Sequence, residues 1–121
     1  MQNITSPRTD DSAIEQEIQA KGLTAPRVTP ADLEANIACQ YFFTASDATK
    51  DCPQHESLRL LTFCVIVLQN GFTVTGESAC ASPENFDAEV GRKIARENAK
   101  QKIWPLMGYA LKNSLSQQPK E

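Results

Sequence analysis

Residues 61–80 read Leu-Thr-Phe-Cys-Val-Ile-Val-Leu-Gln-Asn-Gly-Phe-Thr-Val-Thr-Gly-Glu-Ser-Ala-Cys, and this stretch decides the fold class. Two runs rich in β-branched and aromatic residues flank Asn70-Gly71. Asn-Gly between such runs is the strongest short-range signal of a hairpin, because a type I′ turn needs φ > 0 at both central positions. The sequence therefore predicts a β-hairpin with strands 61–69 and 72–80 and a two-residue turn.

A two-residue turn also predicts the register of the hairpin. It pairs Gln69 with Phe72 and Val67 with Val74, and cross-strand partners share a face of the sheet. The other face combines apolar residues on the first strand with polar residues on the second, which favours a third strand or a partner molecule over solvent. The residues expected to face the core are Phe63, Val65, Val67, Phe72 and Val74.

A long amphipathic helix is expected after the hairpin, over residues 83–104. Ser82 is a candidate N-cap, and Pro83 suits the first helical position. Apolar residues recur at helical spacing, and an adjoining strip of small residues allows the helix to approach the hairpin closely. Pro105 disfavours helical geometry at Trp104, so the helix is expected to stop or kink there.

Two shorter helices are expected before the hairpin. The first runs from Ser12 to a stop at Gly22, and the second begins with a Thr29 cap and ends near Gln40. Residues 41–45 have the composition of a possible third strand. The predicted fold class is α+β: a short antiparallel sheet packed by the long helix, with N-terminal helices. We expect one domain at 12–113 between flexible tails at 1–11 and 114–121.

The overall composition restricts the classes of partner. The chain has 121 residues, a net charge of −3 and a pI near 5.2, whereas general nucleic-acid or anionic-membrane binding needs a dominant basic field. No run approaches the roughly 18 apolar residues of a membrane span, and the N-terminus lacks the pattern of a secretory signal. We therefore expect a cytoplasmic protein with reduced cysteines, no general nucleic-acid binding and no membrane association.

Two reactive arrangements are weighed and set aside. Cys52 and His55 form one close pair of zinc-ligand types, whereas a structural zinc site normally presents two such pairs. Cys80 precedes a predicted helix N-terminus, which would lower a thiol pKa, but nothing brings a base such as His55 beside it. The sequence predicts no metal, no cofactor and no catalytic residue.

A weak anion-binding pattern joins the end of the hairpin to the long helix. A strand that runs into a helix N-terminus exposes free backbone N–H groups, and like charges four residues apart on the helix favour an acidic partner. A solvated charged face explains the same residues. The candidate contacts for a nucleotide or phosphorylated ligand are Ser78, Ser82, Asn85, Arg92 and Arg96.

Four segments resemble a family of small tailed-phage proteins named after gene products 49 and 66 of two phages. These segments are 61–65, 70–80, 85–86 and 102–109, and the likeness extends roughly from Val28 to Leu111. The resemblance implies an origin in a phage or prophage and expression in the bacterial cytoplasm, and it carries over no catalytic residue.

Three functions follow as hypotheses, and the third of them is a structural component of the virion, which would co-purify with phage particles. The leading one is a small non-enzymatic phage accessory protein that binds a host protein or a host-derived ligand and modulates or inhibits a host process or defence. The alternative is a nucleotide or phosphorylated-ligand binding protein. A small sheet with a mixed second face also gains from pairing with another copy, so we expect a homodimer or a higher homo-oligomer.

Overall fold

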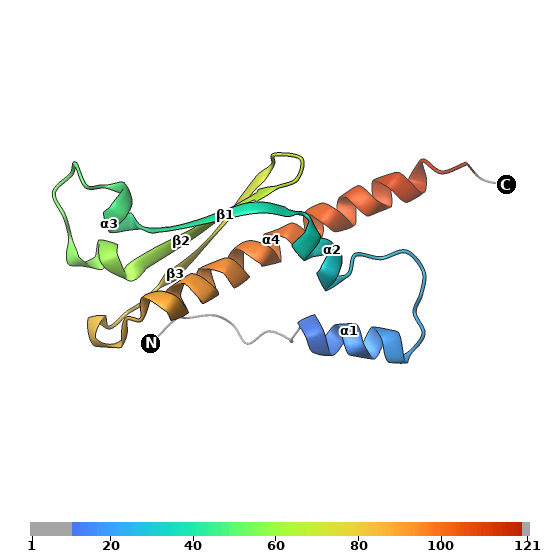
Figure 1. Ribbon diagram of the computed structural model, residues 1–121, viewed down its shortest axis with the longest axis horizontal. Coiled ribbons are helices and arrows are strands. Elements are labelled where there is room, and N and C mark those ends of the chain that lie inside the picture. The colour runs from blue at the N-terminus through green and yellow to red at the C-terminus, as the bar shows by residue number, and fades with distance from the viewer. Residues whose placement is uncertain (1–10, 120–121) are drawn as a thin grey trace.

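The computed structural model describes residues 11–119, which form a three-stranded sheet and its surrounding helices (Figure 1). The predicted tail at 1–11 lies outside these residues except for Asp11, which begins the first helix. In chain order the elements are α1 (Asp11–Ala20), α2 (Pro30–Ala35), β1 (Ile37–Thr44), α3 (Ala45–Ala48), η1 (Glu56–Leu60), β2 (Leu61–Leu68), β3 (Thr73–Ala79), η2 (Pro83–Asn85) and α4 (Ala88–Ser116).

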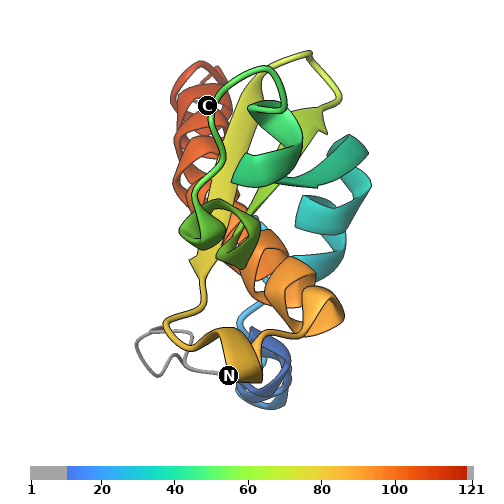
Figure 2. The ribbon, with the colours of Figure 1, turned by 90° about the vertical axis from the view of Figure 1, so that its left-hand side faces the viewer.

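The sheet is antiparallel in the order β1-β2-β3, and α4 packs against β2 and β3. The hairpin loop lies at the top of the molecule and α1 at the bottom in both Figure 1 and Figure 2. Because helices and an antiparallel sheet form separate layers, the fold is α+β, as predicted.

The third strand is present but begins earlier than expected. The helix capped by Thr29 ends at Ala35, and the chain is already extended from Ile37 onward. Ile37 and Tyr41 fit a helical repeat and a strand alternation equally well, and pairing with β2 selects the strand. The backbone N–H of Gln69 donates to the carbonyl of Asn36 at 2.9 Å and holds this junction beside the hairpin loop.

The predicted hairpin register is wrong by one residue. The Gly71 N–H donates to the Leu68 carbonyl, and the Leu68 N–H donates to the Phe72 carbonyl, both at 2.8 Å. Gly71 alone in this loop has positive φ, at 91°, so Asn70 does not adopt the type I′ geometry. The loop is the three-residue connection 69–71, a type I turn that ends in the left-handed Gly71, which is the next most common hairpin connection. As a result, Ile66 pairs with Val74.

This shift reverses the faces of β2, because side chains alternate along a strand. Cys64 and Ile66 are fully buried beneath α4, whereas Phe63, Val65 and Val67 point away from the core and are only partly covered. Val74 is buried as expected. The buried cluster consists of Leu33, Cys64, Ile66, Leu68, Val74, Ala95, Ala99 and Ile103.

The contact between α4 and β3 depends on small residues on both elements. A Cβ atom at Gly76 would overlap the carbonyl oxygen of Ala95 and the backbone nitrogen of Ala99. Both alanines are fully buried. The predicted close approach of the helix to the hairpin is therefore confirmed, and Gly76 is the strand residue that permits it.

Both ends of α4 differ from the prediction. Pro83 starts only a short 3-10 turn, and α4 begins at Ala88 after the N-cap Asp87, whose carboxylate accepts from the Val90 N–H at 3.0 Å. The helix then continues through Pro105 to Ser116. An internal proline costs about 3 kcal/mol in an isolated helix. Packing of the residues around Pro105 against the core offsets that cost, since Ile103 is buried and Trp104 and Met107 are partly buried.

Candidate functional site

The five residues predicted to bind an anion are dispersed. Ser78 is buried on the α4-facing side of β3, Ser82 and Asn85 lie in the link that contains η2, and Arg92 and Arg96 lie on α4. The Ser82 side chain makes no capping hydrogen bond. Ligand binding by this set remains a prediction.

The N-terminus of α4 carries its own anion. The Asp87 carboxylate already accepts a backbone N–H in the first turn, where a bound phosphate was expected. The prediction that Ser82 caps the long helix was wrong. The sequence has two successive helix N-termini, and Ser82 precedes the short η2, whereas Asp87 is the N-cap of α4.

Arg96 forms an internal ion pair on the β1 side of α4. Its guanidinium donates to the Glu34 carboxylate and to the Gln40 side chain, both at 2.7 Å. Lys100 lies 3.0 Å from the same carboxylate, and the Arg96 hydrogen bond lowers the pKa of Glu34. Glu34 thus relieves the repulsion between the basic residues that suggested an external anion.

Arg96 and Ser78 also lie on different sides of the long helix. Asn98, two residues after Arg96, donates its amide to the Glu77 carbonyl on β3 at 2.8 Å, whereas Arg96 reaches Gln40 on β1. β1 and β3 are the two edges of the sheet. These contacts direct Arg96 towards the β1 edge, whereas Ser78 belongs to the β3 edge.

The cysteines and the histidine do not assemble into a reactive group. Cys52 and Cys39 are exposed, Cys64 and Cys80 are buried, and burial raises the pKa of the Cys64 thiol. The His55 Nδ1 accepts from the Ser57 N–H at 3.1 Å and caps η1. Within residues 11–119, no three His, Cys, Asp or Glu side chains are grouped so as to hold a metal ion.

The most unusual surface is the side of the sheet opposite α4, which we name the open sheet face. Its residues are Cys39, Tyr41 and Phe43 on β1, Phe63, Val65 and Val67 on β2, and Thr73, Thr75 and Glu77 on β3. The rings of Phe43 and Phe63 stack with centroids 5.4 Å apart, and Tyr41 is 57% exposed. Aromatic and β-branched side chains therefore dominate β1 and β2 on this face.

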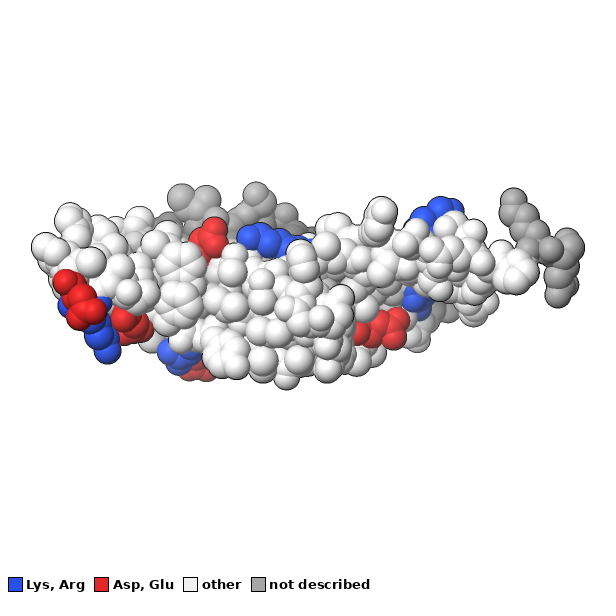
Figure 3. All heavy atoms as spheres, turned by 90° about the horizontal axis from the view of Figure 1, so that it is seen from above, with Lys and Arg blue, Asp and Glu red and all other residues white. Residues whose placement is uncertain are grey.

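Charge is sparse over this part of the molecule. Figure 3, seen from above relative to Figure 1, shows a broad area without charged side chains over the strands, with charged groups towards its margins. Glu77, on the edge strand β3, is the one ionisable carboxylate among the nine residues. The hydrogen bond with Cys39 raises the pKa of Tyr41 from an ordinary value at which the phenol is already neutral, so Tyr41 adds no charge to this face.

The sequence contained an indication of this surface, the apolar run of β2, but the prediction assigned its side chains to the wrong face of the sheet. The unbroken apolar run of β2 is typical of a strand that is covered on both faces. The register error placed Phe63, Val65 and Val67 in the core, so their availability for a partner was missed.

The family model described as "Phage protein (N4 Gp49/phage Sf6 gene 66) family" matches residues 28–115. The chain belongs to this phage protein family. The matched residues include the whole sheet and nearly all of α4, and the match confirms the resemblance of the hairpin and helix segments. The helix α1 precedes the region that defines the Gp49/gene 66 family match.

No curated protein and no solved structure matches the chain. Among the helices of residues 11–119, none combines the length and the apolar character that a membrane crossing requires.

Proposed function

We propose that this member of the Gp49/gene 66 family is a non-enzymatic phage accessory protein that binds a host protein through the open sheet face. It acts in the cytoplasm of the infected bacterium, as a modulator or inhibitor of a host process. The observation that carries the proposal is the composition of β2: apart from Thr62 its side chains are apolar on both faces, and α4 covers only one of these faces.

The chemistry of the open sheet face favours a protein partner over a nucleic acid. Phosphate backbones are held by Lys and Arg, and none of the nine residues of this face is basic. Protein interfaces are enriched in aromatic side chains at their centre, where Tyr and Trp contribute most to binding. Tyr41 beside the Phe43–Phe63 stack fits that pattern.

A second copy of the chain is the competing occupant of the same face. An uncharged surface is compatible with itself, and two sheets that pack face to face bury both apolar layers. The expected homodimer or higher homo-oligomer would use this packing. Sedimentation of the purified protein distinguishes these two hypotheses. If the protein is a monomer at micromolar concentration, the open sheet face is available for a host partner.

Capture from infected cells with a matched pair of variants tests the proposal. Tyr41→Asp introduces a charge into the open sheet face, and Tyr109→Asp makes the same change on α4, where the tyrosine is 75% exposed. Wild type and Tyr109→Asp should retain the same host protein, and Tyr41→Asp should lose it. Circular dichroism should show equal folding of all three proteins.

Direct binding to the purified candidate then completes the test. Truncation of a central interface aromatic weakens binding by about 2 kcal/mol or more, and a buried charge costs at least as much. Equal affinity of wild type and Tyr41→Asp for the captured protein would exclude the open sheet face as the binding surface. Turnover of a nucleotide or peptide by the purified chain would exclude a purely non-enzymatic role.

A further inference from the structure

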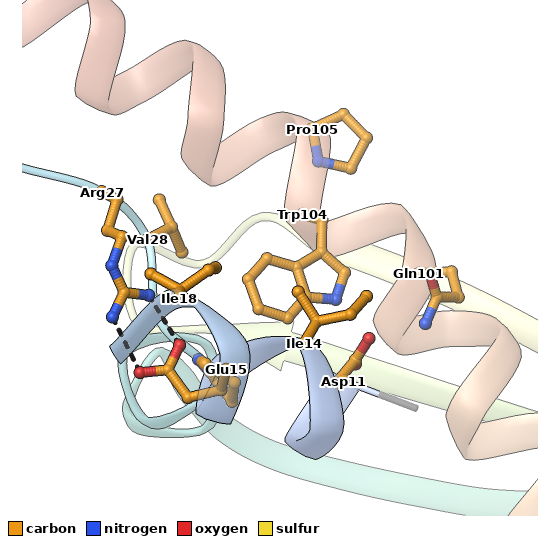
Figure 4. A pocket seen from close by; sticks show the side chains of 10 residues that line it. Asp11, Ile14, Glu15, Ile18, Arg27, Val28, Gln101, Trp104 and Pro105 are labelled. Atoms are coloured by element: carbon orange, nitrogen blue, oxygen red, sulfur yellow. Dashed lines mark hydrogen bonds and ion pairs between the residues drawn. The ribbon is translucent and has the colours of Figure 1, made fainter. Parts of the chain in front are cut away.

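A pocket of about 630 Å³ lies between α1 and the middle of α4, far from the open sheet face. Its volume is in the range of sites that hold small molecules. Figure 4 shows α1 on one side of the pocket and Trp104 of α4 on the other. Much of its lining precedes residue 28, where the family match begins.

Most of the lining is apolar. Ile14 and Ile18 point from α1 towards the indole of Trp104, and further apolar surface comes from Val28 and Pro105 (Figure 4). None of the residues of α1 is buried, so these isoleucines do not belong to the protein core. An indole beside two aliphatic side chains suits an apolar or aromatic ligand body.

One end of the pocket is polar and has unused hydrogen-bonding capacity. Figure 4 shows the Asp11 carboxylate, the Gln101 amide and the indole nitrogen of Trp104 on the same side. Within the described part of the chain, none of these three side chains makes a hydrogen bond. Pro105 has no N–H, so the Gln101 carbonyl also lacks the donor that an ordinary helix would supply.

The charges of the lining favour a cation. Arg27 donates two hydrogen bonds to the Glu15 carboxylate, at 2.6 and 2.8 Å, on the other side of the pocket. This contact lowers the pKa of Glu15 to about 2, and it engages the Arg27 guanidinium, so that Arg27 is paired with Glu15. Among the described residues, the Asp11 carboxylate is the one charged group of the lining without an ion pair, and the face of an indole attracts cations as well.

We propose that this pocket binds a small organic cation, with an ammonium group at the Asp11 end and an apolar or aromatic body against Ile14, Ile18 and Trp104. The pocket and the open sheet face share no residues, so this proposal does not depend on host-protein binding. The ion pair between Glu15 and Arg27 holds α1 in place as one wall of the pocket. Asp11 is then the residue that selects a cation.

The chain carries its own reporter for this site, because Trp104 is its single tryptophan. Titration with 2-phenylethylammonium should change the tryptophan emission saturably. The neutral isostere 2-phenylethanol and the anionic 3-phenylpropionate should bind at least about fivefold more weakly, since a charge-assisted contact outweighs a neutral one. The phenyl probes do not absorb where tryptophan is excited.

Asp11→Asn and Asp51→Asn provide a matched pair of variants. Both remove one carboxylate charge, but Asp51 lies in the exposed loop that follows α3. Asp11→Asn should weaken 2-phenylethylammonium binding by about five- to tenfold, and Asp51→Asn should leave it unchanged. Circular dichroism checks that both variants keep the wild-type fold.

Three results would overturn the proposal. The first is the absence of saturable binding, and the second is equal binding of the cationic, neutral and anionic probes, which would indicate an apolar seam without charge selection. The third is equal weakening by Asp11→Asn and Asp51→Asn, which would indicate a general effect of net charge.

Discussion

The two faces of the sheet carry similar side chains on β2 but have different surroundings. Cys64 and Ile66 are fully buried under α4, whereas Val65 and Val67, their neighbours in sequence, lie on a surface that nothing within residues 11–119 encloses. An antiparallel strand with one wet face normally alternates apolar and polar residues. The comparison teaches that β2 has the composition of a strand with both faces buried, although α4 buries only one of them.

The largest expected effect comes from the covered face, at Gly76. In Gly76→Ala the added Cβ meets backbone atoms of α4, which cannot rotate away. We expect the free energy of unfolding to fall by about 4 kcal/mol or more, at the upper end of single-substitution effects. Urea denaturation followed by circular dichroism measures the loss.

Gly108→Ala is the control for this substitution. Apart from the backbone of its own helix and its chain neighbours, no described atom lies within 4 Å of the added Cβ at Gly108, which also lies in α4. Alanine in a helix interior should stabilise by about 0.5–1 kcal/mol. Similar losses for both glycines would show that the helix does not approach β3 as closely as described.

A second experiment compares the two faces directly. Ile66→Ala leaves a cavity in the core and should cost about 3 kcal/mol, within the range for buried aliphatic residues. Val65→Ala removes side-chain volume from the open sheet face and should cost less than about 1 kcal/mol in a monomer. If Val65→Ala proved equally costly in a protein that sediments as a monomer, the open sheet face would have to be covered by its own chain.

The hairpin loop determines which face of β2 points inward. Gly71→Ala places a side chain at φ 91° and should cost about 1–2 kcal/mol. Asn70→Ala should cost less, about 1 kcal/mol, because it removes only the hydrogen bond from the Phe72 N–H to the Asn70 side chain. The opposite order of these two losses would favour the type I′ turn and the other register.

The smallest effect concerns the Glu34 ion pair below the sheet. Its lowered pKa means that the pair contributes stability above the unfolded-state pKa near 4.3, and that this contribution is lost as the pH falls through the lower folded-state pKa. Glu34→Gln should therefore cost about 0.5 kcal/mol at pH 7, since the carboxylate is partly exposed, and should match wild type once both are neutral.

Glu89→Gln provides the comparison for Glu34→Gln. The Glu89–Lys93 pair is exposed and spans one turn of α4, so the variant should show little change at either pH. Denaturation curves at pH 7 and near pH 2.5 measure both variants. An equal response of the two would indicate a general effect of net charge.

The elements of the fold were predictable where local chemistry alone decides them. The hairpin follows from Asn70-Gly71, and the cap of α2 follows from Thr29, whose side chain accepts from the Asp32 N–H at 3.0 Å. The end of α1 at Ala20, two residues before the left-handed Gly22 with its φ of 67°, follows in the same way. Each of these signals acts within a few residues along the chain.

The register and the open sheet face were not predictable from such signals. Asn-Gly fits both a two-residue and a three-residue loop, and the apolar residues of β2 offer no polar face to choose between them. The deciding contact is long-range, between Gly76 and the backbone of α4. The ion pair of Arg96 was not predictable for a similar reason, because Glu34 reaches it from a distant part of the sequence.

The length of α4 has a practical consequence. Its 29 residues extend for roughly 43 Å at about 1.5 Å per residue. The eight residues of β2 extend for only about 27 Å. The C-terminal turns therefore overhang the strands (Figure 1), so the helix acts as a built-in spacer arm. A fluorophore or an affinity handle attached after Ser116 would be held clear of the strands, which makes this end suitable for immobilisation.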